Sequence, residues 1–244
     1  MNVYVIADLH LSSDNPRLID AFESFSEQIS NGDELYILGD LFNYYVGVDP
    51  ANEAQAAVRR VNSSVESRGG RVFFIHGNRD FLLNRYDAHY FKVKLLDDIA
   101  VAKVLGTDIL LLHGDELCDE NLLYFVFRKI SRCFLLQRIF NFLTSFDYRT
   151  RIARRMRNKS MQNFAADNYV KRMINNESAR ALMNRYGVKI LIHGHTHTVG
   201  ETVIDGCGRV IDTGDWNSDS FTYIKISDDN SGKPGLEIIQ KKLS

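Results

Sequence analysis

Five short apolar runs in this chain are each followed directly by a small polar cluster. The runs span residues 2–7, 34–38, 71–75, 108–112 and 189–192. Apolar runs of this length without alternation are typical of strands that are buried on both faces. Helical patterns over 16–30 and 52–67 separate the first three runs. Alternating strands and helices predict an α/β sandwich.

Two regions depart from this alternation. Beyond residue 200, short strands are expected at 201–204, 208–212, 221–226 and 236–241, and turns rich in glycine and aspartate suggest an antiparallel end. The stretch 119–177 is instead helical in pattern and strongly basic. We therefore expect a core domain made of 1–118 and 178–244, with 119–177 as a helical cap inserted between two of its strands.

The composition and the N-terminus favour a cytoplasmic protein. The three cysteines, Cys118, Cys133 and Cys207, are too few and too scattered for a disulfide framework. The chain begins with a strand pattern rather than the basic start and longer apolar run of a signal peptide. No stretch approaches the ~18 apolar residues that a membrane span requires.

The polar clusters after the five runs carry candidate metal ligands. In open α/β sheets, functional sites form at the carboxyl ends of the strands, so the clusters should converge on one edge of the sheet. Carboxylates, an amide and imidazoles together suit Mn, Fe or Zn. The clusters are Asp8-Leu9-His10, Gly39-Asp40, Gly77-Asn78-Arg79-Asp80, His113-Gly114-Asp115 and Gly194-His195-Thr196-His197.

These ligands fit a pair of cations ~3.5–4 Å apart, the arrangement used for phosphoryl transfer. We expect Asp40 to bridge the two ions, which would lower the pKa of a bound water and neutralise phosphoryl charge. Arg79 suits a phosphate oxygen, and with Asn78 and His113 it forms the expected catalytic set. The expected ligands are Asp8, His10 and His197 for one ion, and Asn78, His113 and His195 for the other.

Each cluster taken alone has a simpler explanation. A single aspartate after a strand is more often a helix cap or a turn residue, and a single buried histidine is more often hydrogen-bonded than a ligand. Five such clusters in this order, each after a strand, favour the metal site. His76, His89 and His193 are not expected to be ligands, although His76 and His193 adjoin motif glycines and suit supporting positions.

The ordered clusters resemble those of the calcineurin-like metallophosphoesterase superfamily. Longer stretches, up to about residue 199, resemble the UDP-2,3-diacylglucosamine pyrophosphohydrolase family within it. The resemblance implies a metallophosphoesterase β-sandwich flanked by helices, with a helical cap. It also implies manganese-dependent release of UMP and a diacylated glucosamine 1-phosphate during lipid A synthesis. The matching segments are 6–11, 36–42, 74–83, 113–118, 151–157 and 191–197.

The inserted segment combines positive charge with apolar side chains. Between residues 121 and 159 lie ten Lys or Arg and one Asp, a net charge of +9, whereas the whole chain carries −1. Cations interleaved with Phe and Leu are typical of an interfacial helix attracted to anionic lipid. A helical pair that packs on the core with a solvated basic face is the alternative. We expect a peripheral position on the inner face of the inner membrane, with no nucleic-acid partner and no obligate protein partner.

The resemblance also implies a substrate pocket beside the metals, to which Asn78, Arg79 and His195 would contribute. An apolar groove walled by Tyr124, Phe127, Leu136 and Phe140 is expected beside the metals. Three positions depart from well-known members of the family: Asn121 replaces an Asp, Phe164 an Asn and Asp167 a Lys. Lys171 is placed to compensate for the last change. The insertion residues that match pocket positions are Tyr124, Phe127, Arg157 and Ser160.

Two other functions remain open from the sequence. One is a soluble phosphodiesterase or nucleotide pyrophosphatase without a lipid substrate. The other is a scaffold that keeps the fold without activity. Scaffolds of that kind lose ligands, and here every ligand type is present, which favours an enzyme.

Overall fold

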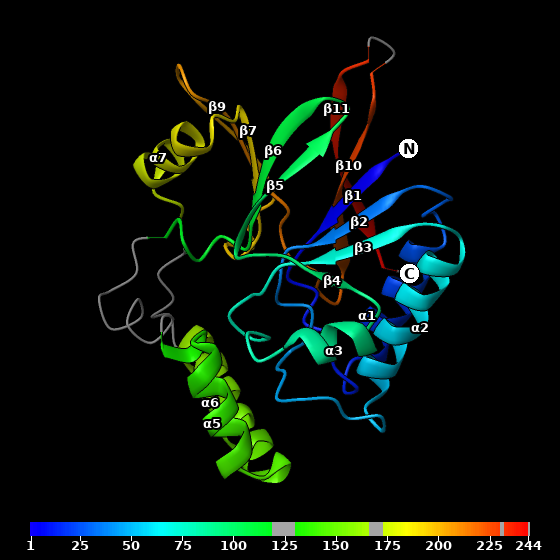
Figure 1. Cartoon of the computed structure of the whole chain (residues 1–244), viewed down its shortest axis with the longest axis vertical. Coiled ribbons are helices and arrows are strands. Elements are labelled where there is room, and N and C mark those ends of the chain that lie inside the picture. The colour runs from blue at the N-terminus through cyan, green and yellow to red at the C-terminus, as the bar shows by residue number, and fades with distance from the viewer. Residues whose placement is uncertain (119–129, 166–172, 230–231, 244) are drawn as a thin grey trace.

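The computed structural model describes residues 1–118, 130–165, 173–229 and 232–243, with side chains except at 134 and 159–165. Two mixed sheets pack face to face, and helices cover their outer faces (Figure 1). This arrangement confirms the α/β sandwich flanked by helices.

The first sheet has six strands in the order β11-β10-β1-β2-β3-β4. The three pairings from β1 to β4 are parallel, and β10 joins the other edge of β1 in the antiparallel direction. The strands are β1 (Val3–Ile6), β2 (Glu34–Ile37), β3 (Arg71–Phe74), β4 (Lys94–Leu95), β10 (Ser220–Asp228) and β11 (Pro234–Lys242).

The second sheet has five strands in the order β5-β6-β7-β9-β8. The sequence predicted an antiparallel end beyond residue 200, which is correct for β8 with β9 and for β10 with β11. It is wrong for β9, which pairs with β7 in parallel. The strands are β5 (Ile99–Val104), β6 (Thr107–Leu112), β7 (Ile190–His193), β8 (Gly200–Ile204) and β9 (Gly208–Asp212).

Alternation along each strand divides the apolar residues between two cores. In β1, Tyr4 and Ile6 face the helices, whereas Val3 and Val5 face the other sheet. Because both faces of the central strands are covered, these strands are continuous apolar runs in the sequence. A third core lies between the second sheet and one further helix.

The helices that cover the sheets are amphipathic. The first begins at Pro16, whose fixed φ suits the first helical position. Asn52, Asn84 and Asn175 cap the other three by accepting hydrogen bonds from their first turns. The helices are α1 (Pro16–Ser26), α2 (Glu53–Ser67) and α3 (Arg85–Tyr90) on the first sheet, and α7 (Asn176–Tyr186) on the second.

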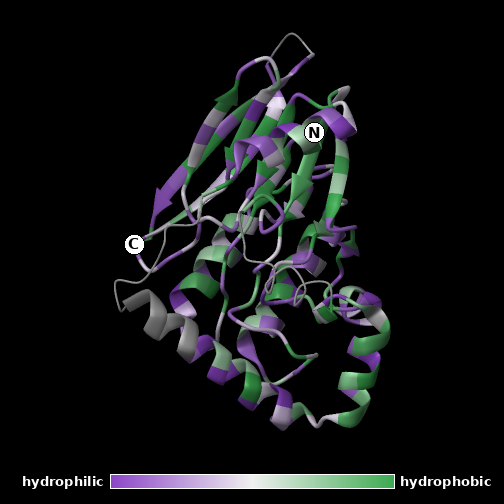
Figure 2. Cartoon of the chain, turned by 90° about the vertical axis from the view of Figure 1, so that its left-hand side faces the viewer, coloured by the Kyte–Doolittle hydropathy of each residue, from purple (hydrophilic) through white to green (hydrophobic). Residues whose placement is uncertain are grey.

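The predicted insertion contains two more helices, α5 (Phe134–Leu143) and α6 (Phe146–Ala165), which lie beside the loops at the carboxyl ends of the central strands (Figure 1). Most residues of α5 are hydrophobic (Figure 2), and several of them, such as Leu135 and Phe142, are exposed. Within the described ranges, no helix is both long enough and apolar enough to cross a bilayer. The domain boundaries remain a prediction.

Candidate active site

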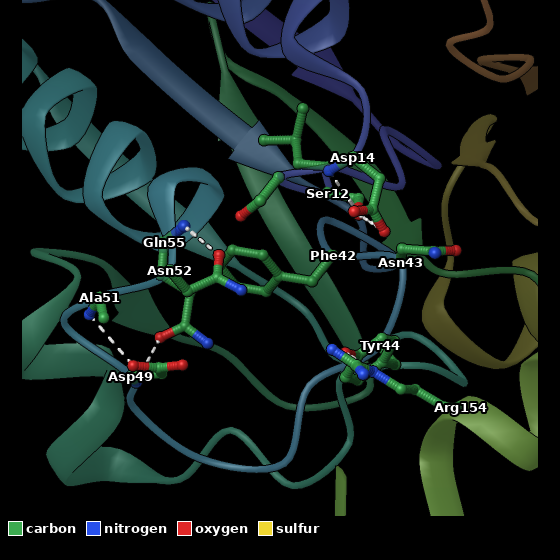
Figure 3. A pocket seen from close by; sticks show the side chains of 12 residues that line it. Ser12, Asp14, Phe42, Asn43, Tyr44, Asp49, Ala51, Asn52, Gln55 and Arg154 are labelled. Carbon is green, nitrogen blue, oxygen red and sulfur yellow. Dashed lines mark hydrogen bonds between the residues drawn. The ribbon is translucent and has the colours of Figure 1, made fainter. Parts of the chain in front are cut away.

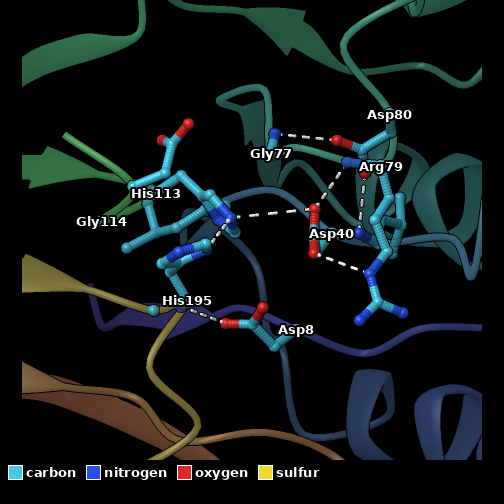
Figure 4. A network of polar contacts seen from close by, with 12 residues as sticks. Asp8, Asp40, Gly77, Arg79, Asp80, His113, Gly114 and His195 are labelled. Atoms are coloured by element: carbon cyan, nitrogen blue, oxygen red, sulfur yellow. Dashed lines mark hydrogen bonds and ion pairs between the residues drawn. The ribbon is translucent and has the colours of Figure 1, made fainter. Parts of the chain in front are cut away.

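The predicted ligands come together at the carboxyl ends of strands from both sheets, and Figure 4 shows four of them, Asp8, Asp40, His113 and His195. Loops after β1, β2 and β3 carry four of them, and loops after β6 and β7 carry the rest. The sequence argument placed all clusters on the edge of one sheet. The structure divides them between two sheets, whose edges meet because the sheets pack face to face.

The backbone of these loops is unusual. Positive φ angles of 50–71° occur at five predicted ligands, and at only two other non-glycine residues of the described chain. A left-handed conformation costs a residue with a Cβ roughly 1–3 kcal/mol and persists only where the surroundings enforce it. Clustering of this strain therefore marks a functional site. The five ligands are Asp8, His10, Asp40, His195 and His197.

Glycines allow the loops to approach one another closely. A Cβ on Gly39 would collide with the backbone of Gly77, and a Cβ on Gly194 would collide with the carboxylate of Asp8. Gly39 also has a φ of 84°. The glycines in the motifs are therefore required by the contact between loops.

One group of ligands consists of Asp8, His10 and His197. The Nε2 atoms of the two histidines are 3.3 Å apart, and Asp8 Oδ1 lies 3.4 Å from His197 Nε2. Two nitrogens that each bind an ion at about 2.1 Å are separated by about 3 Å, so this spacing suits a shared cation. Asp8 Oδ1 and His10 Nδ1 are buried without a hydrogen-bond partner, which a positive ion would supply to the carboxylate.

The other group surrounds Asp40. His113 Nε2 lies 3.8 Å from Asp40 Oδ1 and 3.1 Å from His195 Nδ1. The opposite nitrogen of His113, Nδ1, lies 2.8 Å from the Leu38 carbonyl and donates its proton there, so Nε2 is the nitrogen that would bind a cation after losing its proton. The Asn78 amide lies 2.6 and 2.8 Å from the two Asp40 oxygens. With its oxygen turned inward, this amide would share a cation with Asp40.

Asp40 lies between the two groups. Its Oδ1 faces His113, and its Oδ2 lies 4.0 Å from His10 Nδ1. Asp8 also comes within ligand range of Asp40 and His113, a proximity that the sequence argument did not include. The donor set of carboxylates, imidazoles and an amide fits divalent cations of the Mn, Fe or Zn type.

The ionisable groups at this centre perturb one another strongly. Burial, with Arg79 next, holds the pKa of His10 well below its usual value. Burial also lowers the pKa of His113, but Asp40 and Asp8 outweigh it and raise that pKa to about 9. Burial raises the pKa of Asp40. Carboxylates and imidazoles thus compete for protons that a cation would replace.

Two guanidinium groups face this centre. Arg79 Nε lies 3.1 Å from Asp40 Oδ2, and the backbone N–H of Arg79 donates to Asp40 Oδ1 at 2.9 Å. Burial and the neighbouring Arg79 lower the pKa of the half-buried Arg157 to about 10. Arg157 forms no ion pair with any described residue, so this part of the chain leaves its charge available for an anion.

Asp80 supports the site without being a predicted ligand. Its two oxygens accept hydrogen bonds from the backbone N–H groups of Gly77 and Leu41, both at 2.8 Å. It thereby joins the loop after β3 to the loop after β2. Burial, with Asp40 next, raises the pKa of Asp80 to about 6. Its place in the Gly-Asn-Arg-Asp motif was the sequence signal for this role.

The structure places the predicted substrate residues unevenly. Arg157 lies beside Arg79, and His195 lies beside His113. Ser160 and Phe164 lie in α6, but their side chains are outside the described part of the chain. Of the predicted groove, Leu136 and Phe140 are exposed on α5. The remaining predictions fall outside the described residues: Asn121, Tyr124, Phe127, Asp167 and Lys171.

A pocket of about 180 Å³ lies where α6 meets the loops that continue from His10 and Asp40 (Figure 3). Arg154 reaches from α6 across it and donates to the Tyr44 hydroxyl at 3.1 Å. Several of its polar groups are held in local hydrogen bonds, such as Gln55 Oε1 with the N–H of Asp49 at 2.8 Å. The pocket is thus a junction between α6 and the core.

Comparison with known proteins agrees with this geometry. The model of the family described as "Calcineurin-like phosphoesterase" matches residues 1–199. Proteins named UDP-2,3-diacylglucosamine hydrolase are similar over nearly the whole chain. The one from Neisseria gonorrhoeae is 33% identical over 93% of this chain and 95% of its own length. The one from Haemophilus influenzae is 35% identical over 96% of this chain and 97% of its own length.

A third relative with that name, from Aeromonas salmonicida, is 36% identical over 88% of this chain and 86% of its own length. The residues matched by the family model include all five ligand-bearing loops. The chain therefore belongs to the calcineurin-like phosphoesterase family of metal-dependent hydrolases.

Proposed function

We propose that this protein hydrolyses the pyrophosphate bond of UDP-2,3-diacylglucosamine to UMP and 2,3-diacylglucosamine 1-phosphate, a step of lipid A synthesis. The observation that carries the proposal is the pair of guanidinium groups, Arg79 and Arg157, beside a complete set of metal ligands. Relatives that match more than nine-tenths of the chain are named for hydrolysis of this lipid nucleotide.

The ligands are proposed to hold two divalent cations, most suitably Mn²⁺. When bound, such cations supply a nucleophile from water at neutral pH and neutralise charge on the phosphoryl oxygens. Asp40 would serve both ions because its two oxygens face different histidines. Asp8, His10 and His197 would complete one site, and Asn78, His113 and His195 the other.

The two arginines are assigned to the two phosphates of the substrate. Arg79 is held by Asp40 through Nε and donates from Nη1 to Asn43 Oδ1 at 3.3 Å, and its Nη2 would bind the phosphoryl group that is attacked. Arg157 approaches from α6 and would bind the second phosphate. A pyrophosphate would bind both guanidinium groups at once, whereas a single phosphodiester needs only one of them. The lipid pocket residues Asn121, Tyr124, Phe127, Ser160, Phe164 and Asp167 are assigned by resemblance alone.

The inserted helices are proposed to meet the inner face of the inner membrane. On α5, the residues Leu135, Phe142 and Leu143 are 64%, 89% and 73% exposed. Exposed apolar groups on a basic segment suit the surface of an anionic bilayer. Each methylene covered there contributes ~0.8 kcal/mol, and each nearby cation ~1 kcal/mol. A soluble enzyme for small nucleotides has no use for such a surface.

Incubation of the purified protein with UDP-2,3-diacylglucosamine and Mn²⁺ tests the proposal. Release of UMP together with the lipid phosphate is expected, and chelator should abolish it. If the protein instead cleaved simple phosphodiesters and left the lipid nucleotide intact, the substrate assignment would be wrong. The outcome would then favour the soluble phosphodiesterase.

A further inference from the structure

One largely buried arginine of the inserted segment touches the loops that carry the metal ligands. Arg132 lies in the turn before α5, and its side chain is only 12% exposed. Its guanidinium nitrogens lie 2.7 Å from Asp98 and 3.1 Å from Asp115, and 3.7 Å from Glu116. It also donates to the Gly77 carbonyl at 3.4 Å.

The position of these partners links Arg132 to two ligands. Asp115 is two residues after His113, and its side chain has no exposed surface. Gly77 directly precedes Asn78. Arg132 thus joins the loop after β6 to the loop after β3, and does so from outside the core strands.

A second side chain of the same segment contacts the other end of the loop after β3. Gln137, one turn into α5, donates from Nε2 to the Phe81 carbonyl at 2.8 Å and to the Ser131 carbonyl at 2.8 Å. Gly77 and Phe81 flank the residues 78–80. The inserted segment therefore holds this loop at both ends, and Ser131 ties Gln137 to the turn that carries Arg132.

We propose that Arg132 and Gln137 are positioning residues for the cation site formed by Asn78, His113 and His195. By this inference, which rests on the metal assignment of the proposed function, the inserted segment sets the affinity of that site in addition to contacting substrate. Removing the guanidinium would leave the buried Asp115 without this cation and free Gly77 from the loop after β6. Loss of a group that orients metal ligands typically weakens metal binding by 10–100-fold.

The competing explanation is that Arg132 only attaches the inserted helices to the core. Both explanations expect a lower melting temperature in a variant, so melting alone does not separate them. They differ in metal affinity measured where the protein is folded. Attachment alone leaves that affinity unchanged.

The test is a titration of the full-length protein with Mn²⁺ alone, in the variants Arg132→Met and Gln137→Met. Arg17→Met is the matched control, because Arg17 is exposed on α1 and forms no ion pair within the described ranges. Calorimetry or the EPR signal of free Mn²⁺ gives both dissociation constants, and circular dichroism shows that each variant is folded.

Arg132→Met should weaken one of the two Mn²⁺ sites by at least about tenfold and leave the other within about twofold. Gln137→Met should weaken the same site to a smaller extent. Raising Mn²⁺ should restore kcat on a chromogenic phosphodiester, which a purely structural defect would not allow. Both dissociation constants within about twofold of wild type in both variants would overturn the inference.

Arg132→Lys covers the case in which Arg132→Met does not fold. Lysine keeps the charge near Asp115 but lacks the planar fork that reaches Gly77 and Asp98 together. An intermediate loss of affinity is expected, and wild-type affinity in both Arg132→Lys and Gln137→Met would contradict the inference. The Mn²⁺ titration needs no substrate, so a wild-type protein that fails to release UMP would refute the proposed substrate and leave this inference intact.

Discussion

Replacing Arg79 separates charge stabilisation from metal binding. The Arg79 side chain is 19% exposed, pairs with Asp40 through Nε at 3.1 Å and donates from Nη1 to Asn43 Oδ1 at 3.3 Å, which holds the guanidinium beside the metal ligands. The backbone N–H of residue 79 donates to Asp40 Oδ1 at 2.9 Å, and this contact survives any side-chain replacement. Arg79→Ala should therefore leave the cations in place while removing the guanidinium.

The expected loss is large. Removing one preorganised donor from a site where charge develops costs about 2.7–4 kcal/mol, or roughly 10²–10³ in kcat. Arg79→Lys keeps a charge but cannot bind Asp40 and phosphate in the same planar fork. The kcat of Arg79→Lys should therefore be on the order of tenfold above that of Arg79→Ala and still below that of the wild type.

Steady-state kinetics on UDP-2,3-diacylglucosamine and on a chromogenic phosphodiester give kcat and KM, and elemental analysis gives the metal content of each variant. The prediction is a reduced kcat with two ions still bound. Near-wild-type kcat on both substrates would refute the role of Arg79 at phosphate. A parallel loss of ions would instead assign Arg79 to the metal site.

Three further predictions concern the cations and the inserted helices. His10→Ala or Asp40→Ala should lower both Mn²⁺ content and turnover, the latter by at least roughly a hundredfold, and a fully active variant would contradict the ligand assignment. Because the pKa of His113 is raised to about 9, this histidine is protonated at pH 7 without a cation, so Mn²⁺ binding should release about one proton and tighten as pH rises from 7 to 9. Calorimetry in buffers of different ionisation enthalpy measures this release, and no proton release would refute it. The protein should bind anionic liposomes and dissociate as salt increases, and binding that is absent, or equal on neutral liposomes, would contradict the membrane proposal.

The central architecture could be predicted because each buried strand is a continuous apolar run followed by a polar loop. The residues after 6, 37 and 74 are examples, and the structure brings their polar side chains together. The distribution of the ligands over two sheets could not be predicted. Parallel strands in either sheet give the same local pattern, and pairing partners lie far apart in the sequence.

The left-handed backbone at the ligands was also beyond the sequence. Asp and His adopt positive φ more readily than most residues, but composition does not say where. The close approach of Gly39 to Gly77 is a tertiary contact, and only the folded loops show that a Cβ at residue 39 would collide there.

From the sequence, the basic residues of the inserted segment were interpreted as a surface for anionic lipid. In the structure, some of these residues instead bind other parts of the protein. Arg149 donates to the carbonyls of Val46, Asn141 and Thr144 at 3.1, 3.0 and 2.8 Å. Arg132 is buried against acidic residues of the core. A basic count cannot distinguish a cation that faces a membrane from one that docks a helix.

The ratio of kcat/KM for UDP-2,3-diacylglucosamine to kcat/KM for the same nucleotide sugar without acyl chains tests the account most directly. Both substrates carry the same pyrophosphate, so the metal centre, Arg79 and Arg157 treat them alike. Two acyl chains covered by the protein contribute ~0.8 kcal/mol per methylene, so even a few methylenes give more than a hundredfold. The account predicts release of UMP from the acylated substrate with a ratio of at least about a hundred, and a ratio near one would contradict it.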